Sequence, residues 1–470
     1  MNKDNKDNKE LQSDEKNQGK LRRELGLPSV IFFLFGYVVG AGILIQTGVT
    51  AGETGPALWL AFIIAGIPNI INAIIISYIV SAFPVSGGAW VYSSRLGSPL
   101  IGFLVLASII LHIMSALALL AIGFGRYFEV FIPGSALLMG AIILLVFLVI
   151  NLLGVKFAGW VQIVLAICGD FLVIIIFIIF GFPNIELKRL LDPQGGLFPT
   201  GFIGIFTGAV ILSFSYAGFQ AIIEIGGEIK NPRKNIPLGL IISFFLIAVV
   251  YILVSIVMTG TMDWRELGRI EGTLIDVAAN FLPMWFLSFL NILILIAIAS
   301  TIHGVLLAYS RDLFSAARDK IVPDFLSKIN KKYNTPHWSL IFFIIGSIIL
   351  LIFQASIIDL SFMSSLTIAI AGVVIAYIPV TLEKKYPELV KNSKFKLKRK
   401  VLLGLVGFNV LYSILSIMLM IAVSPSVVFS ATIFYLLAII YYILRKRWLK
   451  KKGLNLDEIC KKIPEEALEV

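Results

Sequence analysis

The sequence has few of the residues that soluble proteins use at their surfaces and in their active sites. Asp, Glu, Lys and Arg make up only 14% of the 470 residues, and there are three histidines. The two cysteines, Cys168 and Cys460, provide neither a disulfide framework nor the spacing of a metal site. No nucleophile, base and orienting group occur together, which argues against an enzyme. We therefore expect no catalytic residue and no cofactor.

Long apolar runs dominate instead. Hydrophobic residues make up 58% of the chain and the mean hydropathy is +0.95, which excludes an ordinary soluble core. Runs of about 20 apolar residues are the length of membrane-spanning helices. A β-barrel is disfavoured, because a run such as residues 172–181 is apolar on every face. The sequence predicts an all-α membrane protein with twelve transmembrane helices, near 28–50, 57–82, 100–125, 135–155, 158–181, 199–226, 236–260, 283–310, 337–353, 359–380, 401–423 and 427–448.

The net charge of +11 is best explained by membrane topology. If the N-terminus lies in the cytoplasm, nearly all of the 39 Lys and Arg residues fall in cytoplasmic segments. The outward segments then hold only Arg126, Lys188, Arg189, Arg265 and Arg269. We expect both termini in the cytoplasm, a multi-pass protein of the cytoplasmic membrane with the lipid bilayer as its surroundings, and no nucleic-acid partner. Residues 1–20 contain no apolar core, so they do not resemble a cleaved signal.

The first span contains a glycine-rich stretch, residues 36–48, with the cluster Gly40-Ala41-Gly42 at its centre. Each glycine costs about 1 kcal/mol relative to alanine in a helix, so this segment predicts a break. Unpaired main-chain groups are tolerated at membrane depth only where protein or ligand satisfies them, which makes the break a candidate binding site. The alternative is that the glycines only permit close helix packing.

The sixth span contains a second polar, glycine-containing stretch, Phe214-Ser-Tyr-Ala-Gly-Phe-Gln220. Because spans one and six lie five spans apart, the second begins on the opposite side of the membrane. Matching interruptions in two inverted halves are typical of a transport site at the membrane midplane. The second break therefore favours binding over packing alone.

Two polar side chains lie deep in other spans. His112 in span three either contacts a substrate or hydrogen-bonds a main-chain carbonyl as a neutral ring. Asp170 in span five is surrounded by apolar residues and either carries a coupling proton or bonds a neighbouring helix.

Span eight contains Ser300 and Thr301, whose hydroxyl oxygens suit Na⁺ together with main-chain carbonyls of span one. The alternative is that both hydroxyls bond back to their own helix. No other metal site is predicted.

Four stretches, residues 36–48, 214–237, 310–323 and the pair Thr335-Pro336, together resemble the amino acid–polyamine–organocation superfamily, and specifically its amino acid permeases. The resemblance implies a five-plus-five inverted repeat with discontinuous helices one and six, followed by two further helices. The expected organisation is a disordered cytoplasmic tail at 1–27, a ten-helix transport core at 28–380, a basic cytoplasmic loop at 381–400, helices eleven and twelve at 401–448 and a cytoplasmic tail at 449–470.

The resemblance also implies roles for individual residues. The N–H groups of Gly40, Ala41 and Gly42 would bind the carboxylate of an amino acid. The carbonyls of Val38, Phe214 and Ala217 would bind its ammonium group, and the Phe214 ring would close over the substrate as a gate. Ile43, Ser215 and Gly218 would complete the substrate site.

Two positions depart from the pattern of the superfamily. Many relatives have an acid where this chain has Gln220, so gating of a cationic substrate at that position is in doubt. Some proton-coupled relatives have a lysine near Gly169, which this chain lacks. Coupling then falls to a proton on Asp170, to Na⁺ near Ser300 and Thr301, or to substrate exchange without an ion.

The expected function is secondary active transport of amino acids by alternating access, through ion-coupled symport or exchange. A transporter of polyamines or other organocations is one alternative, although a polyamine would require pocket acids that spans one, three and six lack. A non-transporting amino-acid sensor of the same fold is the other. For an amino acid transporter, the preferred substrate is a neutral, apolar or aromatic amino acid.

Overall fold

The computed structural model describes residues 25–83, 88–153, 161–162, 164–165, 167–191, 195–219, 222, 229–270, 273–330, 335–353, 356–376, 378–460 and 462. These residues are almost entirely helical. The β-type contacts among them are two isolated bridges, Leu25 with Ile229 and Asn330 with Thr335. The all-α prediction is confirmed for this part of the chain.

Seven described segments are helical, apolar and long enough to cross a membrane, and five shorter apolar helices accompany them. The long helices are α4 (Leu58–Ala82), α6 (Pro99–Phe128), α13 (Pro232–Thr261), α16 (Met284–Arg318), α18 (Ile357–Ile375), α21 (Arg399–Val423) and α22 (Pro425–Lys451). The shorter ones contain α2 (Leu27–Val38), α7 (Ala136–Leu152), α9 (Leu172–Gly181), α11 (Gly201–Leu212) and α17 (His337–Phe353). Helix α3 (Ala41–Thr54) belongs to the same long segment as α4. The count of twelve spans and the inverted repeat stay predictions.

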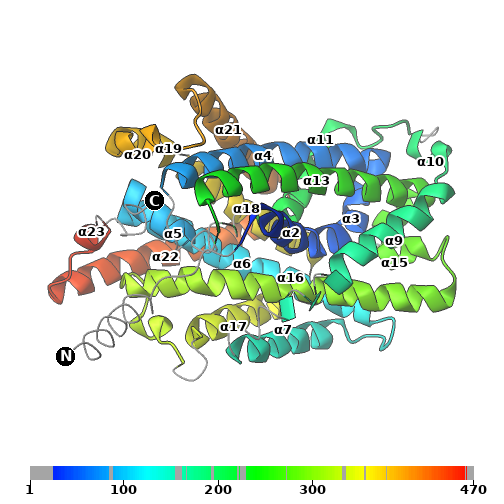
Figure 1. Ribbon diagram of the computed structural model, residues 1–470. Coiled ribbons are helices and arrows are strands. Elements are labelled where there is room, and N and C mark those ends of the chain that lie inside the picture. The colour runs from blue at the N-terminus through cyan, green and yellow to red at the C-terminus, as the bar shows by residue number, and fades with distance from the viewer. Residues whose placement is uncertain are drawn as a thin grey trace, which may run out of the picture.

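Figure 1 shows these helices running side by side, with α2 and α3 in the middle of the bundle. Helices α4, α11 and α13 lie on one side of this pair, and α6 and α16 lie on the other. The short helices α5 (Gly88–Tyr92), α19 (Ile378–Lys385), α20 (Pro387–Lys391) and α23 (Leu456–Ile459) gather at the left end of the view. Helices α10 (Leu187–Leu191) and α15 (Leu274–Ala278) lie at the right end. The central pair is therefore enclosed by the rest of the fold.

Short helical turns join these elements. They are the 3₁₀ turns η1 (Gly55–Ala57), η4 (Phe182–Asn184), η5 (Ser213–Tyr216) and η7 (Asp324–Ser327), the π-helical segments η2 (Ser93–Gly97) and η3 (Ile167–Phe171), and the helix α14 (Trp264–Ile270). The basic segment 381–400, expected as a loop, contains the end of α19 and all of α20.

Both predicted helix interruptions are confirmed. In the first, α2 ends at Val38 and α3 begins at Ala41. In the second, α11 gives way to η5, and the chain then extends at Ala217. Gly218 follows with φ +124°, a conformation that side chains rarely adopt, and an added Cβ there would lie 2.8 Å from the Tyr37 ring. Glycine is needed at this point for both its backbone freedom and its small size.

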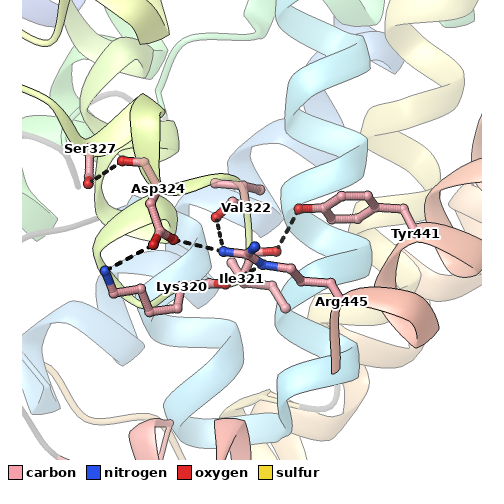
Figure 2. Close-up of polar contacts among 7 residues, drawn as sticks. All are labelled: Lys320, Ile321, Val322, Asp324, Ser327, Tyr441 and Arg445. Atoms are coloured by element: carbon pink, nitrogen blue, oxygen red, sulfur yellow. Dashed lines mark hydrogen bonds and ion pairs between the residues drawn. The ribbon is translucent and has the colours of Figure 1, made fainter. Parts of the chain in front are cut away.

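The last long helix, α22, is bonded to the loop that follows α16 (Figure 2). The Arg445 guanidinium donates to the carbonyls of Lys320 at 2.9 Å and Val322 at 3.0 Å, and pairs with Asp324 at 2.8 Å. The Tyr441 hydroxyl donates to the Ile321 carbonyl at 3.1 Å. Helix α22 therefore stabilises the C-terminal end of the central helix α16, and it also has an exposed side.

Candidate functional site

The two helix interruptions meet at one cavity. Helices α6 and α16 form its other walls. The cavity is lined by Tyr37, Val38, Gly42, His112, Ile113, Ala116, Leu120, Phe214, Ala217, Gly218, Thr301, Val305 and Tyr309. Residues 176 positions apart in the sequence, Val38 and Phe214, thus face the same space.

The N-terminus of α3 offers unpaired main-chain donors at this cavity. The first hydrogen bond inside the helix runs from the Leu44 N–H to the Gly40 carbonyl, at 3.3 Å. The N–H groups of Ala41, Gly42 and Ile43 consequently have no acceptor within α3, and they lie at the positive end of its dipole. The Gly40 N–H instead donates to the Val38 carbonyl at 3.1 Å. Such a helix start is suited to a carboxylate.

Gly42 brings this helix start into direct contact with the second break. A Cβ added at Gly42 would lie 2.5 Å from Ser215 Cα, so the two segments pack main chain against main chain. The Ser215 hydroxyl donates to Gln46 Oε1 at 3.0 Å. The Gln46 amide nitrogen donates to the Ile211 carbonyl at 3.2 Å and to the Ser361 hydroxyl at 2.6 Å. Gln46 therefore joins α3 to α11, η5 and α18.

The carbonyl side of the site is partly occupied by hydrogen bonds of the protein itself. The Tyr251 hydroxyl on α13 lies 2.8 Å from the Val38 carbonyl oxygen and 2.7 Å from the Ser215 carbonyl oxygen. The Phe214 carbonyl accepts from the Ala217 N–H at 2.8 Å. A substrate ammonium would add to these bonds or replace one of them.

His112 reaches the cavity from α6. Its Nδ1 lies 2.7 Å from the Ser364 hydroxyl on α18, and its ring centroid is 6.2 Å from that of Phe214. Ser364 is therefore a partner of His112 inside the protein, and the place of His112 in the cavity lining leaves contact with a substrate open. The contact places His112 next to the predicted gate residue.

Asp170, Ser300 and Thr301 come together directly behind the break in span one. Asp170 is 1% exposed in η3, close to Ser300, and its oxygens accept no hydrogen bond of ordinary geometry from the described residues. A Cβ at Gly40 would lie 3.6 Å from Asp170 Oδ1 and would collide with the Thr301 hydroxyl. Thr301 donates to the Ala297 carbonyl of its own helix at 3.3 Å, and Ser300 accepts from Gln162 at 3.1 Å. The three candidate coupling residues thus form one cluster.

Gln220 lies outside the described residues. Of the remaining predicted site residues, Gly40, Ser215 and Ile43 lie beside the cavity without lining it. Sequence reasoning missed Gln46 and Tyr251. Gln46 had a signal, as a lone amide in an apolar span, whereas a membrane tyrosine such as Tyr251 is too common to stand out.

Comparison with known proteins shows the family of this chain. Residues 29–457 match the family described as amino acid permease. The chain belongs to the amino acid permease family. It is 26% identical over 400 residues to the branched-chain amino acid permease BcaP of Bacillus subtilis (strain 168), covering 80% of this chain and 84% of the relative.

Other relatives of this permease carry different names. A methylthioribose transporter of Bacillus subtilis (strain 168) is 29% identical over 337 residues, 67% of this chain and 72% of the relative. The chloroplastic cationic amino acid transporter 9 of Arabidopsis thaliana is 30% identical over 335 residues, 66% of this chain and 58% of the relative. Family membership thus establishes amino acid transport as the general activity, and the side-chain preference must be argued from the cavity.

Proposed function

We propose that this permease is a secondary transporter of neutral, apolar amino acids that works by alternating access around the two broken helices. One observation carries the proposal: the start of α3, through Gly42, and the carbonyl-bearing residues Val38, Phe214 and Ala217 of the two breaks line a single pocket. An amino acid is the solute that presents an anion and a cation one carbon apart. The carboxylate would bind the N–H groups of Ala41, Gly42 and Ile43, and the ammonium the carbonyls of Val38, Phe214 and Ala217.

The wall opposite the breaks supports the preference for an apolar side chain. Ile113, Ala116, Leu120 and Val305 line it, and the described lining contains no Asp, Glu, Lys or Arg. A cationic side chain would lose its hydration there without gaining a counter-charge. One relative is named for branched-chain amino acids and another for cationic amino acids. An apolar wall suits the side chains of the first class better than those of the second.

The cluster behind Gly40 supports ion-coupled symport. Asp170 has buried carboxylate oxygens that a proton or a cation would satisfy, and the hydroxyls of Ser300 and Thr301 stand beside it. A cation bound there would contact the break in span one directly, so its binding and release would act on the substrate site. Exchange without an ion remains the competing mode, because Thr301 already bonds its own helix.

The ends of the bundle support the predicted orientation in the cytoplasmic membrane. Helices α19 and α20, which belong to the basic segment 381–400, lie at the same end of the bundle as α23, and the turn helices α10 and α15 lie at the other. The end with the basic segments would face the cytoplasm, with both termini.

Uptake into proteoliposomes tests the proposal. Purified protein is reconstituted and supplied with labelled valine, phenylalanine or arginine under a proton gradient, a Na⁺ gradient or internal unlabelled substrate. We expect accumulation of valine or phenylalanine under one ion gradient and little arginine uptake. Flux only with internal substrate would establish an exchanger. Binding of amino acid without flux under any condition would refute transport and support a sensor, and preferential uptake of labelled spermidine would support the polyamine alternative.

A further inference from the structure

The hydroxyl of Tyr251 bridges the two broken helices at their main chains. It lies 2.8 Å from the carbonyl oxygen of Val38, the last residue of α2, and 2.7 Å from that of Ser215 in η5. Both carbonyls belong to segments that lack regular helical hydrogen bonding. A single side chain on a third helix, α13, therefore bridges the two interruptions.

The Tyr251 ring is held firmly enough for this role. The residue is 0% exposed, and its ring centroid lies 5.2 Å from that of Phe62 and 5.1 Å from that of Tyr216. The latter pair is edge-on, with planes 67° apart, an arrangement that aromatic rings favour. Phe62 on α4 holds the ring from outside the two broken helices, whereas Tyr216 belongs to η5 itself. The packing therefore fixes the ring against η5, and the hydroxyl carries that position across to α2.

The hydroxyl has one hydrogen for two carbonyl oxygens, so it cannot donate a full hydrogen bond to both at once. The Val38 carbonyl also accepts from the Gly40 N–H at 3.1 Å. An arriving ammonium group brings three donors, of which one can take over a carbonyl while the hydroxyl keeps the other. The arrangement suits a site whose carbonyls must stay aligned when it is empty and accept a cation when it is filled.

We infer that Tyr251 is a positioning residue of the substrate site: its hydroxyl holds the Val38 and Ser215 carbonyls at the separation that main-chain recognition of an amino acid requires. The inference rests on the proposed function. Of these two carbonyls, that of Val38 is proposed to bind the substrate's ammonium group, and that of Ser215 is in the chain segment next to Phe214. Because this contact is made to the substrate's main chain, removing the Tyr251 hydroxyl weakens the binding of all transported amino acids by the same factor, whatever their side chains.

The test compares two tyrosine variants in proteoliposomes. Tyr251→Phe keeps the ring and removes the hydroxyl. Tyr127→Phe is the matched control. Tyr127 is 2% exposed, and its hydroxyl also donates to a carbonyl of span one, that of Leu44 at 2.6 Å. Leu44 lies within regular α3, however, outside the break. For valine and phenylalanine, KM and the maximal rate are measured separately.

We expect Tyr251→Phe to raise KM about three- to tenfold for both substrates alike, because this is the effect of losing one hydrogen bond. The maximal rate should be nearly unchanged. Tyr127→Phe should leave KM within about twofold of wild type, since its bond does not touch the break. Equal KM increases in both variants would overturn the inference, as would a KM change that differs between the two substrates. A lower KM in Tyr251→Phe would also overturn it, because the hydroxyl would then be competing with the ammonium for Val38.

Hydrogen exchange in the absence of substrate separates this inference from the proposed function. Residues 38–42 and 213–218 should exchange faster in Tyr251→Phe than in wild type or Tyr127→Phe, whether or not the protein transports amino acids. Unchanged exchange in both segments would refute the bridging role even if wild-type transport is found. Wild-type protein that transports nothing, with faster exchange in Tyr251→Phe, would refute the proposed function alone.

Discussion

The contact between Gly42 and Ser215 gives a sharp test of how the two interruptions are assembled. In Gly42→Ala the new Cβ would lie 2.5 Å from Ser215 Cα and 2.8 Å from Ser215 Cβ and Oγ. Carbon atoms in contact normally stay at least about 3.5 Å apart, so α3 and η5 must separate by about 1 Å. The closest atom, Ser215 Cα, belongs to the main chain, which cannot rotate away as a flexible side chain would.

Two energetic costs follow from that separation. Overpacking of this size costs about 1–3 kcal/mol. The hydrogen bond from Ser215 to Gln46, now 3.0 Å, would lengthen, and a bond of this kind contributes about 1 kcal/mol. If half of the combined cost falls on the substrate-binding state, KM rises about fivefold or more. The larger Gly42→Leu should abolish uptake altogether while the protein still inserts into the membrane.

Uptake of labelled valine and thermal unfolding in detergent provide the assay. Gly407→Ala on α21 is the control, because a Cβ there meets no atom within 4 Å, and it should behave as wild type. We expect Gly42→Ala to lower the melting temperature and raise KM. A Gly42→Ala protein with wild-type KM and melting temperature would show that η5 can move away from α3 at no cost in free energy. The proposed rigid junction between the two breaks would then be wrong.

Three further changes test other parts of the structure. Asp170→Asn should abolish ion-driven accumulation but keep exchange of internal for external substrate; unchanged accumulation would remove Asp170 from coupling. Arg445→Ala should lower the free energy of unfolding by about 2 kcal/mol, because the carbonyls of Lys320 and Val322 lose a charged donor, whereas a melting temperature equal to that of wild type would contradict this clamp. Burial raises the pKa of the Cys460 thiol to about 11, so little reactive thiolate exists at neutral pH. N-ethylmaleimide should therefore modify Cys460 much faster after unfolding than before, and equal rates would refute its burial.

The sequence predicted the two interruptions because their signal is local. Glycines clustered in an apolar run disfavour a continuous helix wherever the run lies, and Val39 and Gly40 do separate α2 from α3. The positions of most spans also follow from local hydropathy, as with residues 337–353, which coincide with α17. The unpaired N–H donors at the start of α3 follow from the same break, since every helix start leaves N–H groups unpaired.

The contacts between distant segments were not accessible in this way. Nothing near Tyr251 in the sequence indicates that its hydroxyl reaches Val38, 213 positions away. The last spans contain few polar residues, yet the Tyr412 hydroxyl on α21 lies 3.2 Å from the Ser213 hydroxyl at the start of the second break. Such pairs depend on how helices are turned toward one another, and hydropathy does not specify that rotation.

The cluster behind Gly40 shows why packing and function cannot be separated at this site. The sequence left open whether the glycines serve close packing or binding, and the structure has Gly40 against Thr301 and Asp170, and Gly42 against Ser215. Close packing is what brings a buried carboxylate and the hydroxyls of α16 up to the start of α3. A side chain at either glycine would push Thr301 and Asp170, or the second break, away from the same helix start. If an ion binds at that cluster as proposed, ion and substrate would both act on the start of α3, and each glycine keeps one of the two neighbouring segments in contact with it.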